Sequence, residues 1–517
     1  MNSRISLSIV GALLPCALVV PPLLGASCES LSSLQFPDAT ITSARLVESG
    51  TFSPPTGLGA GGESAASPYQ ALDQFCRVEA TLRPSSDSDI KIEVWLPVSG
   101  WNGKFQGVGN GGWAGVITYT ALAAGVSRGY ATASTDTGHV GATGAFALDH
   151  PEKLIDFGYR SEHEMTVKAK KIVEAFYGKA PKYSYWNGCS TGGRQGLKEA
   201  QRFPNDYDGI IAGDPANPRT RLSSWELWLA HATLKDPASY IPPAKYPMVH
   251  KAILDACDSI DGLKDGLIDD PTKCHFDPEV LECKGADGPN CLTTPQVEAA
   301  RKLLSPLKNP RTGEELYPGL EPGTELGWKV GAGGPQPFAP AVDQYKYVVF
   351  RDANWDWRTL NFDSDVALAD KTDHDTINAI DPNIKAFIAH GGKLITYHGW
   401  SDPNVAPLAS VNYYKSVVDS VGSEAKTRDS FRLFMAPGMG HCGGGEGPNT
   451  FDMLTAMEQW VEHGKAPDQV IATHEDNGAA ASAGPPRTRP LCPYPQIAKY
   501  KGSGSIDDAA NFTCRLP

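Results

Sequence analysis

The sequence has no C-x-x-C pair of cysteines and no run of basic residues. A zinc or iron–sulfur cluster is therefore a poor interpretation of its cysteines. Basic residues are also outnumbered, with 46 Lys and Arg against 59 Asp and Glu, a formal net charge of -13 at pH 7 and a pI near 5.4. This negative charge argues against nucleic acid and anionic membrane surfaces as partners. Beyond the N-terminal region, no apolar stretch is long enough for a transmembrane helix.

The N-terminal residues have the pattern of a secretory signal peptide. Arg4 precedes the apolar run ISLSIVGALLPCALVVPPLLGA, which prolines interrupt and which ends in small residues. We expect a signal peptide over residues 1–27 and a secreted mature protein, either extracellular or periplasmic. A lipid anchor on Cys28 is a lesser alternative, because Gly25 stands where a lipobox carries an aliphatic residue.

Cysteine number supports the expected export. Of the eleven cysteines, Cys16 would leave with the signal peptide. An even set then remains, as expected for disulfides in an oxidising compartment. The remaining residues are Cys28, Cys76, Cys189, Cys257, Cys274, Cys283, Cys291, Cys442, Cys492 and Cys514.

Strand and helix patterns alternate on both sides of a central irregular segment. We predict strands at 88–98, 104–112, 129–139, 182–188, 207–215, 391–399 and 431–440, and helices at 161–178, 194–203 and 451–464. Ser161 and Glu164 predict a capping box at the start of the first of these helices. The alternation indicates an α/β protein with a mostly parallel sheet. Because strand periodicity fades between 214 and 384, we interpret that segment as a lid inserted between the catalytic parts 28–213 and 385–517.

The segment Gly188-Cys189-Ser190-Thr191-Gly192 fits the pattern G-x-S-x-G between a predicted strand and a predicted helix. In that context the pattern indicates a nucleophile elbow, a sharp turn that exposes a serine and needs small neighbours. A glycine-rich structural turn is the alternative. We interpret Ser190 as the nucleophile.

A serine nucleophile needs a histidine base that an acid orients, and in α/β-hydrolases the chain order is Ser, Asp or Glu, His. Asp402 follows the predicted strand 391–399, and His441 follows the predicted strand 431–440. We therefore predict a triad of Ser190, Asp402 and His441. Two other histidines, His398 and His139, are interpreted as structural.

An oxyanion hole needs two hydrogen-bond donors. The backbone amide of Thr191, directly after the nucleophile, is the expected first donor. The glycine-rich loop at 107–115 follows an early strand, and Gly112 is the expected second donor. A flexible turn is the alternative interpretation of this loop.

Several motifs resemble the tannase and feruloyl esterase family of secreted α/β-hydrolases: GCSTGGRQG, QRFPNDYDGIIAG, YHGWSDP, GMGHC and RTRPLCPYP. The resemblance covers almost the whole mature chain and implies an α/β-hydrolase fold with a large inserted lid. It also implies a disulfide between Cys189 and Cys442 that clamps Ser190 beside His441. The other implied pairs are Cys28–Cys76, Cys257–Cys274, Cys283–Cys291 and Cys492–Cys514.

The segment CDSIDGLKDGLIDDP (257–271) gathers carboxylates between glycines, which suits Ca²⁺ although the spacing is not that of an EF-hand. A solvated acidic turn is the alternative. The family resemblance implies a structural calcium ion here, away from catalysis, and no organic cofactor. The implied ligands are the side chains of Asp258, Asp261 and Asp265 and the backbone oxygens of Leu263 and Leu267.

The resemblance implies a small-molecule substrate, an ester of an aromatic acid. Candidates are ferulate-type esters from plant cell walls, gallate esters, and mono(2-hydroxyethyl) terephthalate. The hydrolases of the terephthalate ester have an arginine that pairs with the free carboxylate of the substrate. This sequence has no clear counterpart of that arginine, although Arg351 lies nearby in the sequence. Segment 344–357 resembles the feruloyl esterases. Its aromatic residues are candidates to hold a phenyl ring, with lid core as the alternative: Tyr345, Tyr347, Trp355 and Trp357.

Two other classes of function stay open at this point. A thiol hydrolase would use Cys189 with His441 and requires Cys189 to be a free thiol. A non-catalytic, calcium-dependent protein that binds plant phenolics or polysaccharide is the second alternative.

Overall fold

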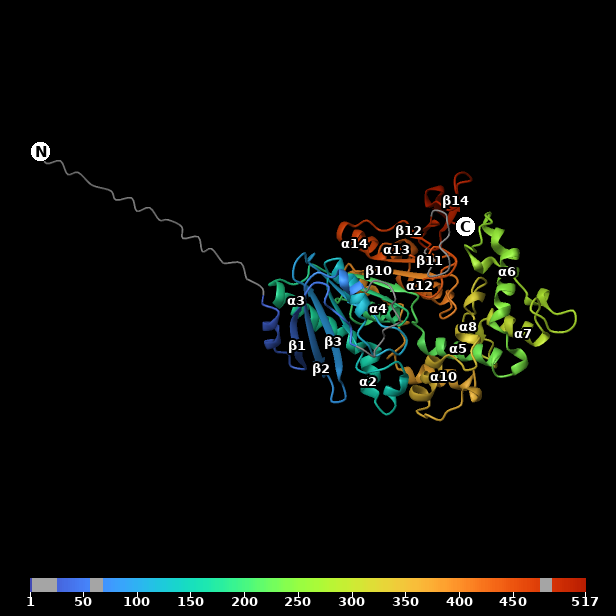
Figure 1. The fold of residues 1–517 in the computed structure, drawn as a ribbon, viewed down its shortest axis with the longest axis horizontal. Coiled ribbons are helices and arrows are strands. Elements are labelled where there is room, and N and C mark those ends of the chain that lie inside the picture. The colour runs from blue at the N-terminus through green and yellow to red at the C-terminus, as the bar shows by residue number, and fades with distance from the viewer. Residues whose placement is uncertain (2–25, 56–67, 475–485) are drawn as a thin grey trace.

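The structure, a computed structural model, describes residues 1, 26–55, 68–474 and 486–517. The predicted signal peptide therefore lies almost entirely outside the described residues. A nine-stranded sheet has the order β1-β2-β3-β5-β4-β6-β7-β10-β11 (Figure 1). Its strands are β1 (Ala39–Val47), β2 (Phe75–Leu82), β3 (Ile90–Pro97), β4 (Lys104–Val108), β5 (Ala131–Thr135), β6 (Tyr183–Cys189), β7 (Gly209–Gly213), β10 (Lys393–Gly399) and β11 (Phe431–Ala436). From β5 to β11 all neighbours are parallel, whereas β1, β2, β3 and β5 pair antiparallel.

The predicted strands from residue 88 onward are present, but β1 and β2 were missed. In β2, the charged residues Arg77 and Glu79 interrupt the apolar pattern that marks a buried strand. The structure explains how the sheet accepts Arg77: its guanidinium makes a two-pronged contact with Glu93 on β3, at 2.8 and 2.5 Å. A paired charge can be buried, and that pairing is invisible in the sequence.

Helices cover both faces of the sheet. The helices α3 (Ser161–Tyr177), α4 (Thr191–Arg202) and α12 (Leu408–Val421) share one apolar cluster with the strands. On the opposite face α14 (Met453–His463) packs through Met457 and Trp460 onto the strand residues Tyr185 and Ile211. Helix α1 (Tyr119–Ser127) packs onto Trp95 and Val108 in a neighbouring cluster. The expected α/β layering is therefore present.

The predicted capping box at the start of α3 is wrong. The helix α2 (Pro151–Ile155) and a π-helical turn at Asp156–Arg160 lead without a break into Ser161, so this residue has helical chain before it. The Ser161 hydroxyl donates to Glu162 (3.0 Å) instead of capping, and Glu164 forms an ion pair with Lys168. The helical stretch begins at Pro151, a position where proline loses no hydrogen bond.

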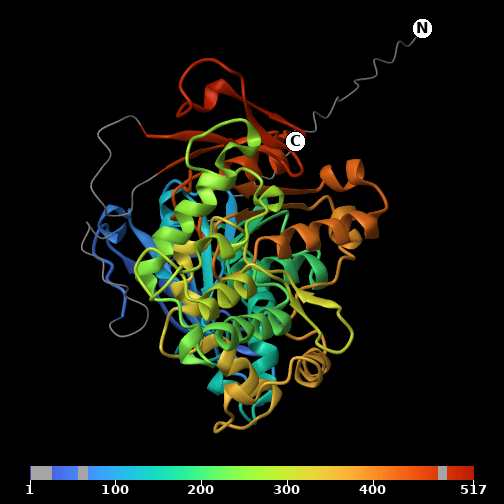
Figure 2. The ribbon, with the colours of Figure 1, turned by 90° about the vertical axis from the view of Figure 1, so that its right-hand side faces the viewer.

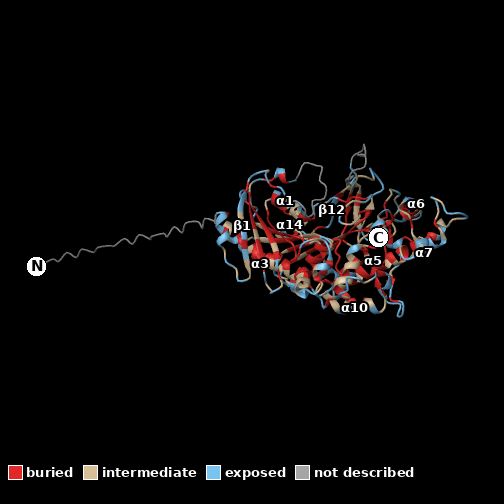
Figure 3. Cartoon of the chain, turned by 60° about the horizontal axis from the view of Figure 1, so that its bottom comes forward, coloured by how far each residue is buried: buried red, intermediate tan, exposed pale blue. Residues whose placement is uncertain are grey.

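The chain between β7 and β10 forms its own helical layer beside the sheet (Figure 1), and this layer lies in front when the molecule is turned (Figure 2). Its elements are α5 (Arg219–Thr233), α6 (Tyr246–Cys257), α7 (Thr294–Leu303), β8 (Leu307–Lys308), β9 (Glu315–Tyr317), α8 (Lys329–Ala332), α9 (Ala339–Asp343), α10 (Ser364–Asp373) and α11 (Lys385–Ala389). Trp225, Val249 and Trp328 belong to a separate apolar core in this layer. Buried residues accordingly occupy the interior of both layers (Figure 3). We refer to this layer as the lid.

Five disulfides hold the chain, and they pair as the family resemblance implies: Cys28–Cys76, Cys189–Cys442, Cys257–Cys274, Cys283–Cys291 and Cys492–Cys514. Two of them lie within the lid. Another joins Cys492, directly after β13 (Thr488–Leu491), to Cys514 on β15 (Phe512–Arg515), which pairs with β14 (Ile497–Tyr500). Across the described ranges, none of the helices has the combined length and apolar character of a membrane span.

Candidate active site

Four neighbouring parallel strands end at the same edge of the sheet, and a polar residue follows each of them. Ser190 follows β6, Asp214 follows β7, Asp402 lies in the loop after β10, and His441 lies in the loop after β11. The carboxyl ends of parallel strands are where α/β proteins place their ligands. Residues that are up to 251 positions apart, the difference between 190 and 441, thereby reach one place.

Ser190 occupies a sharp turn between β6 and α4. Its backbone angles, φ 62° and ψ -120°, lie in a region that side chains rarely adopt. The neighbouring glycines make room for this turn: a Cβ on Gly188 would lie 2.6 Å from the carbonyl carbon of Gly192, and one on Gly193 would lie 2.3 Å from the oxygen of Gly213. The turn therefore has the strain and the crowding of a nucleophile elbow.

His441 and Asp402 form a short hydrogen bond, with Nδ1 2.7 Å from Oδ2. Asp402 is fully buried, and its other oxygen accepts from the backbone amides of Asn404 (2.7 Å) and Val405 (3.0 Å). Burial would raise the pKa of Asp402, but the nearby histidines outweigh it and hold the pKa below its usual range. Burial would lower the pKa of His441, yet the Asp402 charge raises it to about 9. An ionised carboxylate can only accept, so the proton of this bond lies on Nδ1 of His441.

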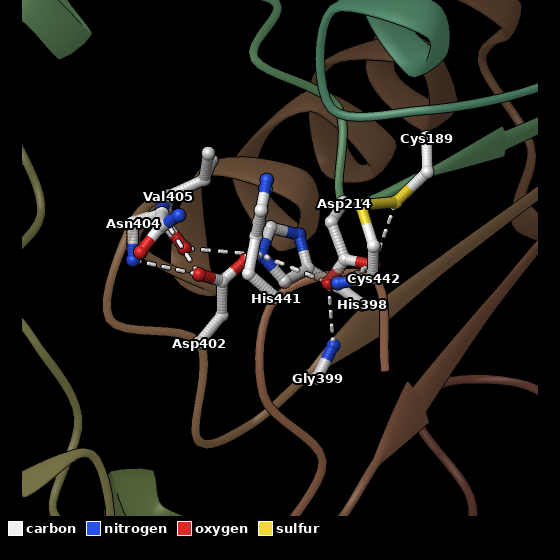
Figure 4. Close-up of a disulfide and its surroundings, with 9 residues drawn as sticks. All are labelled: Cys189, Asp214, His398, Gly399, Asp402, Asn404, Val405, His441 and Cys442. Atoms are coloured by element: carbon white, nitrogen blue, oxygen red, sulfur yellow. Dashed lines mark hydrogen bonds and ion pairs between the residues drawn. A yellow bond between two sulfur atoms is a disulfide. The ribbon is translucent and has the colours of Figure 1, made fainter. Parts of the chain in front are cut away.

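The disulfide Cys189–Cys442 joins the residue before Ser190 to the residue after His441, with Cα atoms 6.0 Å apart (Figure 4). Cys189 is bonded here, so the thiol-hydrolase alternative lacks the free thiol that it needs. Within the described residues the Ser190 hydroxyl makes no hydrogen bond. The approach of Ser190 to His441 is thus supported by the disulfide and by the strand order, rather than by a direct contact.

The predicted oxyanion loop is fastened to the start of α4. The Gly192 amide donates to the Asn110 oxygen (2.8 Å), and the Thr191 hydroxyl donates to the Gly112 oxygen (2.9 Å). Among the described residues, the backbone amides of Thr191 and Gly112 have no acceptor, and nothing lies within 4 Å of the Cβ position of Gly112. Both positions predicted for the oxyanion hole thus have a free amide, and their role stays a prediction.

The two histidines interpreted as structural differ in position. The His139 ring contacts the Trp113 oxygen (2.8 Å) and the Thr137 hydroxyl (3.2 Å), and burial lowers its pKa. It supports the backbone of the oxyanion loop. His398, in contrast, is fully buried and lies 3.1 Å from Asp402.

Two charged residues near the site were not anticipated from the sequence. Asp214 is fully buried between the disulfide and His398. Glu226, on α5 of the lid, is only 4% exposed, and its Oε2 has no hydrogen-bond partner in the described chain. Burial raises the pKa of Glu226 to about 7, although the charges of Arg219 and His441 act against this rise. The only available signal for Glu226 is a carboxylate within the apolar run WELWLA.

The lid aromatic residues that we predicted for substrate binding lie mainly in the lid core. Tyr345 is fully buried, its hydroxyl is 2.6 Å from Ser224, and its ring stacks on Trp355 at 5.4 Å. Trp357 is buried in the same cluster, and Tyr347 is half-buried. These contacts are those of the alternative interpretation, and a role in substrate binding stays a prediction.

In the predicted calcium segment, backbone amides donate hydrogen bonds to the three carboxylates. Asp258 accepts from the amides of Asp265 and Gly266 (both 3.1 Å), Asp261 from that of Leu263 (2.8 Å), and Asp265 from that of Leu267 (3.2 Å). These three carboxylates are not among the clusters of described side chains whose ligand atoms all lie within 4.8 Å of one another.

A fourth acid of this segment, Asp269, was missed from the sequence. It is 4% exposed, and burial followed by the charge of Asp261 raises its pKa to about 8. Arg489 forms an ion pair with Asp265, at 2.5 Å, and also donates to the Ile506 oxygen at 3.3 Å. The segment therefore brings four acidic side chains together, of which Arg489 pairs with one, and the calcium site stays a prediction.

A family model for "Tannase and feruloyl esterase" matches residues 76–515. An "uncharacterized esterase" of Xanthomonas campestris pv. campestris is 39% identical, over 98% of this chain and 94% of the relative. A protein named "Probable feruloyl esterase B-2" of Aspergillus terreus is 36% identical, over 95% of each chain. The crystal structure of feruloyl esterase B from Aspergillus oryzae superposes with a TM-score of 0.87 at 33% identity, over 94% of this chain and 99% of that one.

Proposed function

The chain belongs to the tannase and feruloyl esterase family and is a carboxylic ester hydrolase with an α/β-hydrolase fold, and we propose that Ser190, His441 and Asp402 form its catalytic triad. The observation that carries this proposal is the 2.7 Å bond between His441 and a fully buried Asp402, beside a disulfide that also holds the Ser190 turn. A non-catalytic binding protein does not fit relatives that are named esterases.

The reaction proceeds in two halves. His441 Nε2 takes the proton of the Ser190 hydroxyl, and Oγ attacks the ester carbonyl carbon while the amides of Thr191 and Gly112 stabilise the oxyanion. The tetrahedral intermediate collapses, the C–O bond to the alcohol breaks, and His441 returns the proton to the alcohol. Water then attacks the acyl-serine with His441 as the base, and this step releases the acid and restores the Ser190 hydroxyl.

The substrates that we propose are small esters of hydroxycinnamic acids, such as ferulate esters released from plant cell walls. The support is the similarity to proteins named feruloyl esterase. Gallate esters and mono(2-hydroxyethyl) terephthalate are the alternatives. Wild-type kcat/KM for methyl ferulate, methyl gallate and the terephthalate monoester, measured side by side, ranks the three, and a higher value for either alternative would replace ferulate.

The triad itself is tested with the variant S190A. We expect kcat to fall by a factor of about 10³ to 10⁶ while the circular dichroism spectrum stays that of wild type. The variant S184A is the matched control, because Ser184 is a buried serine of β6, the strand that ends just before Ser190, and it should keep its activity. Full hydrolysis by folded S190A would exclude Ser190 as the nucleophile.

We propose a structural calcium ion in the segment that follows α6, held by the side chains of Asp258, Asp261 and Asp265 and by the carbonyl oxygens of Leu263 and Leu267. The burial of Asp258 and Asp269, and the raised pKa of Asp269 beside Asp261, support it. A bound cation would offset the charge of the ionised carboxylates and hold this part of the lid in place. Asp265 also contacts Arg489 on β13, so the site lies where the lid meets that strand. Secretion is likewise proposed, and the five disulfides support it because they need an oxidising compartment.

A further inference from the structure

A second histidine, fully buried, also contacts the carboxylate of Asp402. His398 Nε2 is 3.1 Å from Asp402 Oδ2 and 3.0 Å from the Val405 carbonyl oxygen. Both neighbours are acceptors, so Nε2 must carry a proton. Because His441 also contacts Oδ2 of Asp402, at 2.7 Å, a single carboxylate oxygen accepts from two imidazoles.

The other ring nitrogen of His398 is also engaged. Nδ1 lies 2.7 Å from the hydroxyl of Ser410 on α12, and a hydroxyl can either donate or accept. The ring is fully buried, so bulk solvent does not hydrate a charge on it. The protonation state of His398 therefore depends on the carboxylates beside it.

Asp214 is the second of these carboxylates. Its Oδ1 lies 3.7 Å from His398 Nε2 and accepts from the Gly399 amide at 2.9 Å. Its Oδ2 accepts from the Cys442 amide at 3.2 Å and lies 3.3 Å from the Cys189 sulfur. Oxygen or nitrogen atoms of Asp214, Asp402 and His441 all lie within 4.8 Å of one another. Figure 4 shows the two aspartates and the two histidines gathered in one cluster beside the disulfide.

We propose that His398 and Asp214 are a buried, charged positioning pair behind the triad. In this pair, protonated His398 holds the same oxygen of the Asp402 carboxylate that His441 contacts, and Asp214 balances the His398 charge and anchors the backbone next to His441. The inference rests on the proposed triad. Neither residue touches the substrate; both act through Asp402 and His441.

The pair would limit how far the surrounding carboxylates raise the pKa of His441. A general base must be unprotonated at the working pH. Asp402, Asp214 and Glu226 all raise the pKa of His441, and two buried carboxylates without compensation would keep the imidazole protonated. A positive charge on His398 opposes them. Consistent with this, the Asp214 and Asp402 charges raise the pKa of His398 despite its burial.

The groups that face this cluster from the other elements are few. Glu226 approaches His441 from α5, Tyr397 faces Asp214 from β10, and Tyr317 faces Asp402 from β9. The pKa of Tyr397 and that of Tyr317 are both raised, chiefly by burial, so both phenols are neutral at the pH of catalysis. Burial raises the pKa of Asp214 to about 6, and its carboxylate is ionised above that pH. The carboxylates that act on His441 are thus those of Asp402, Asp214 and Glu226, and the proposal adds the charge of His398.

The test is the pH profile of kcat/KM for methyl ferulate, whose acidic midpoint reports the free His441. The variant H398Q keeps a donor near Asp402 but removes the positive charge, so Asp214 acts unopposed and the midpoint should rise by about one pH unit. The double variant H398Q/D214N removes both charges, and its midpoint should return close to that of wild type. This return distinguishes a charged pair from a merely structural contact, which would lower activity without moving the midpoint.

Two matched variants control for burial. D373N removes a buried aspartate that, like Asp214, accepts two backbone amides, and H231Q removes a histidine bonded to a backbone carbonyl. Neither residue contacts the cluster of Asp214, Asp402, His398 and His441, so neither variant should move the midpoint. If H398Q does not fold, S410A replaces it, because it leaves a protonated Nδ1 without an acceptor and should shift the midpoint in the same direction.

The proposal is wrong if H398Q leaves the midpoint unchanged or lowers it, or if the double variant keeps the full shift of H398Q. Different results would refute the proposed triad: wild type would hydrolyse no aryl ester, or S190A would hydrolyse one as fast as wild type. An active wild type with an unmoved H398Q midpoint overturns the positioning pair alone.

Discussion

Removing the disulfide Cys189–Cys442 should damage catalysis more than the loss of any other disulfide. The bond closes a loop of sequence separation 253, and the chain-entropy relation gives it about 5 kcal/mol of folding free energy as an upper figure. The double variant C189A/C442A avoids a free thiol. Because the bond joins the neighbours of Ser190 and His441, its loss also releases the two reacting groups from each other.

The control is the lid disulfide Cys283–Cys291, whose sequence separation is 8 and whose expected contribution is about 2.5 kcal/mol. We expect C283A/C291A to lower Tm modestly and to keep the wild-type kcat. C189A/C442A should lower Tm further and, at a temperature where it is still folded, should lose at least about tenfold in kcat, because a base works only within hydrogen-bond reach.

The measurements are thermal unfolding followed by circular dichroism, and kcat for methyl ferulate well below the lower Tm. If folded C189A/C442A keeps the wild-type kcat, the disulfide is only a staple of the fold, and the reasoning about positioning is wrong. An equal kcat loss in both double variants would also contradict it.

Three further outcomes are expected. Removing calcium with a chelator should lower Tm, and adding Ca²⁺ back should restore it more effectively than Mg²⁺; an unchanged Tm would contradict the site. The pKa of Glu226 is raised to about 7, so the folded state binds more protons than the unfolded state between about pH 4.5 and 7, and stability falls as pH rises through that window. E226Q should therefore gain Tm relative to wild type at pH 8 but not at pH 4; equal differences at both pH values would refute this. G193A places a Cβ 2.3 Å from the Gly213 oxygen and should lower Tm and kcat, whereas G111A, with nothing within 4 Å, should change Tm little.

Much of the site could be predicted because its signals are local. The glycines around Ser190 are required by the turn itself, and the turn lies between a strand and a helix that each have a clear period. Asp402 and His441 each follow a strand in the order that an α/β-hydrolase needs. The disulfide pairing came from the family resemblance, since spacing alone does not give it.

What the sequence did not reveal depends on contacts between distant segments. Asp214 stands in GDP, which is typical of a turn, and its role becomes visible only when β7 lies between β6 and β10. Arg77 makes β2 look exposed until Glu93 is placed beside it. Ser161 has a capping pattern, yet a preceding helical turn continues into it, so a correct local preference was overridden by the chain before it.

The most direct test of the catalytic centre is to trap the acyl-enzyme or its analogue and to locate it. The protein is treated with an aryl-ester analogue that phosphonylates activated serines, and the digested protein is mapped by mass spectrometry. We expect one modification, on Ser190, that D402N and H441A both slow by orders of magnitude. A modification on another residue, or undiminished labelling in H441A, would contradict the proposed triad.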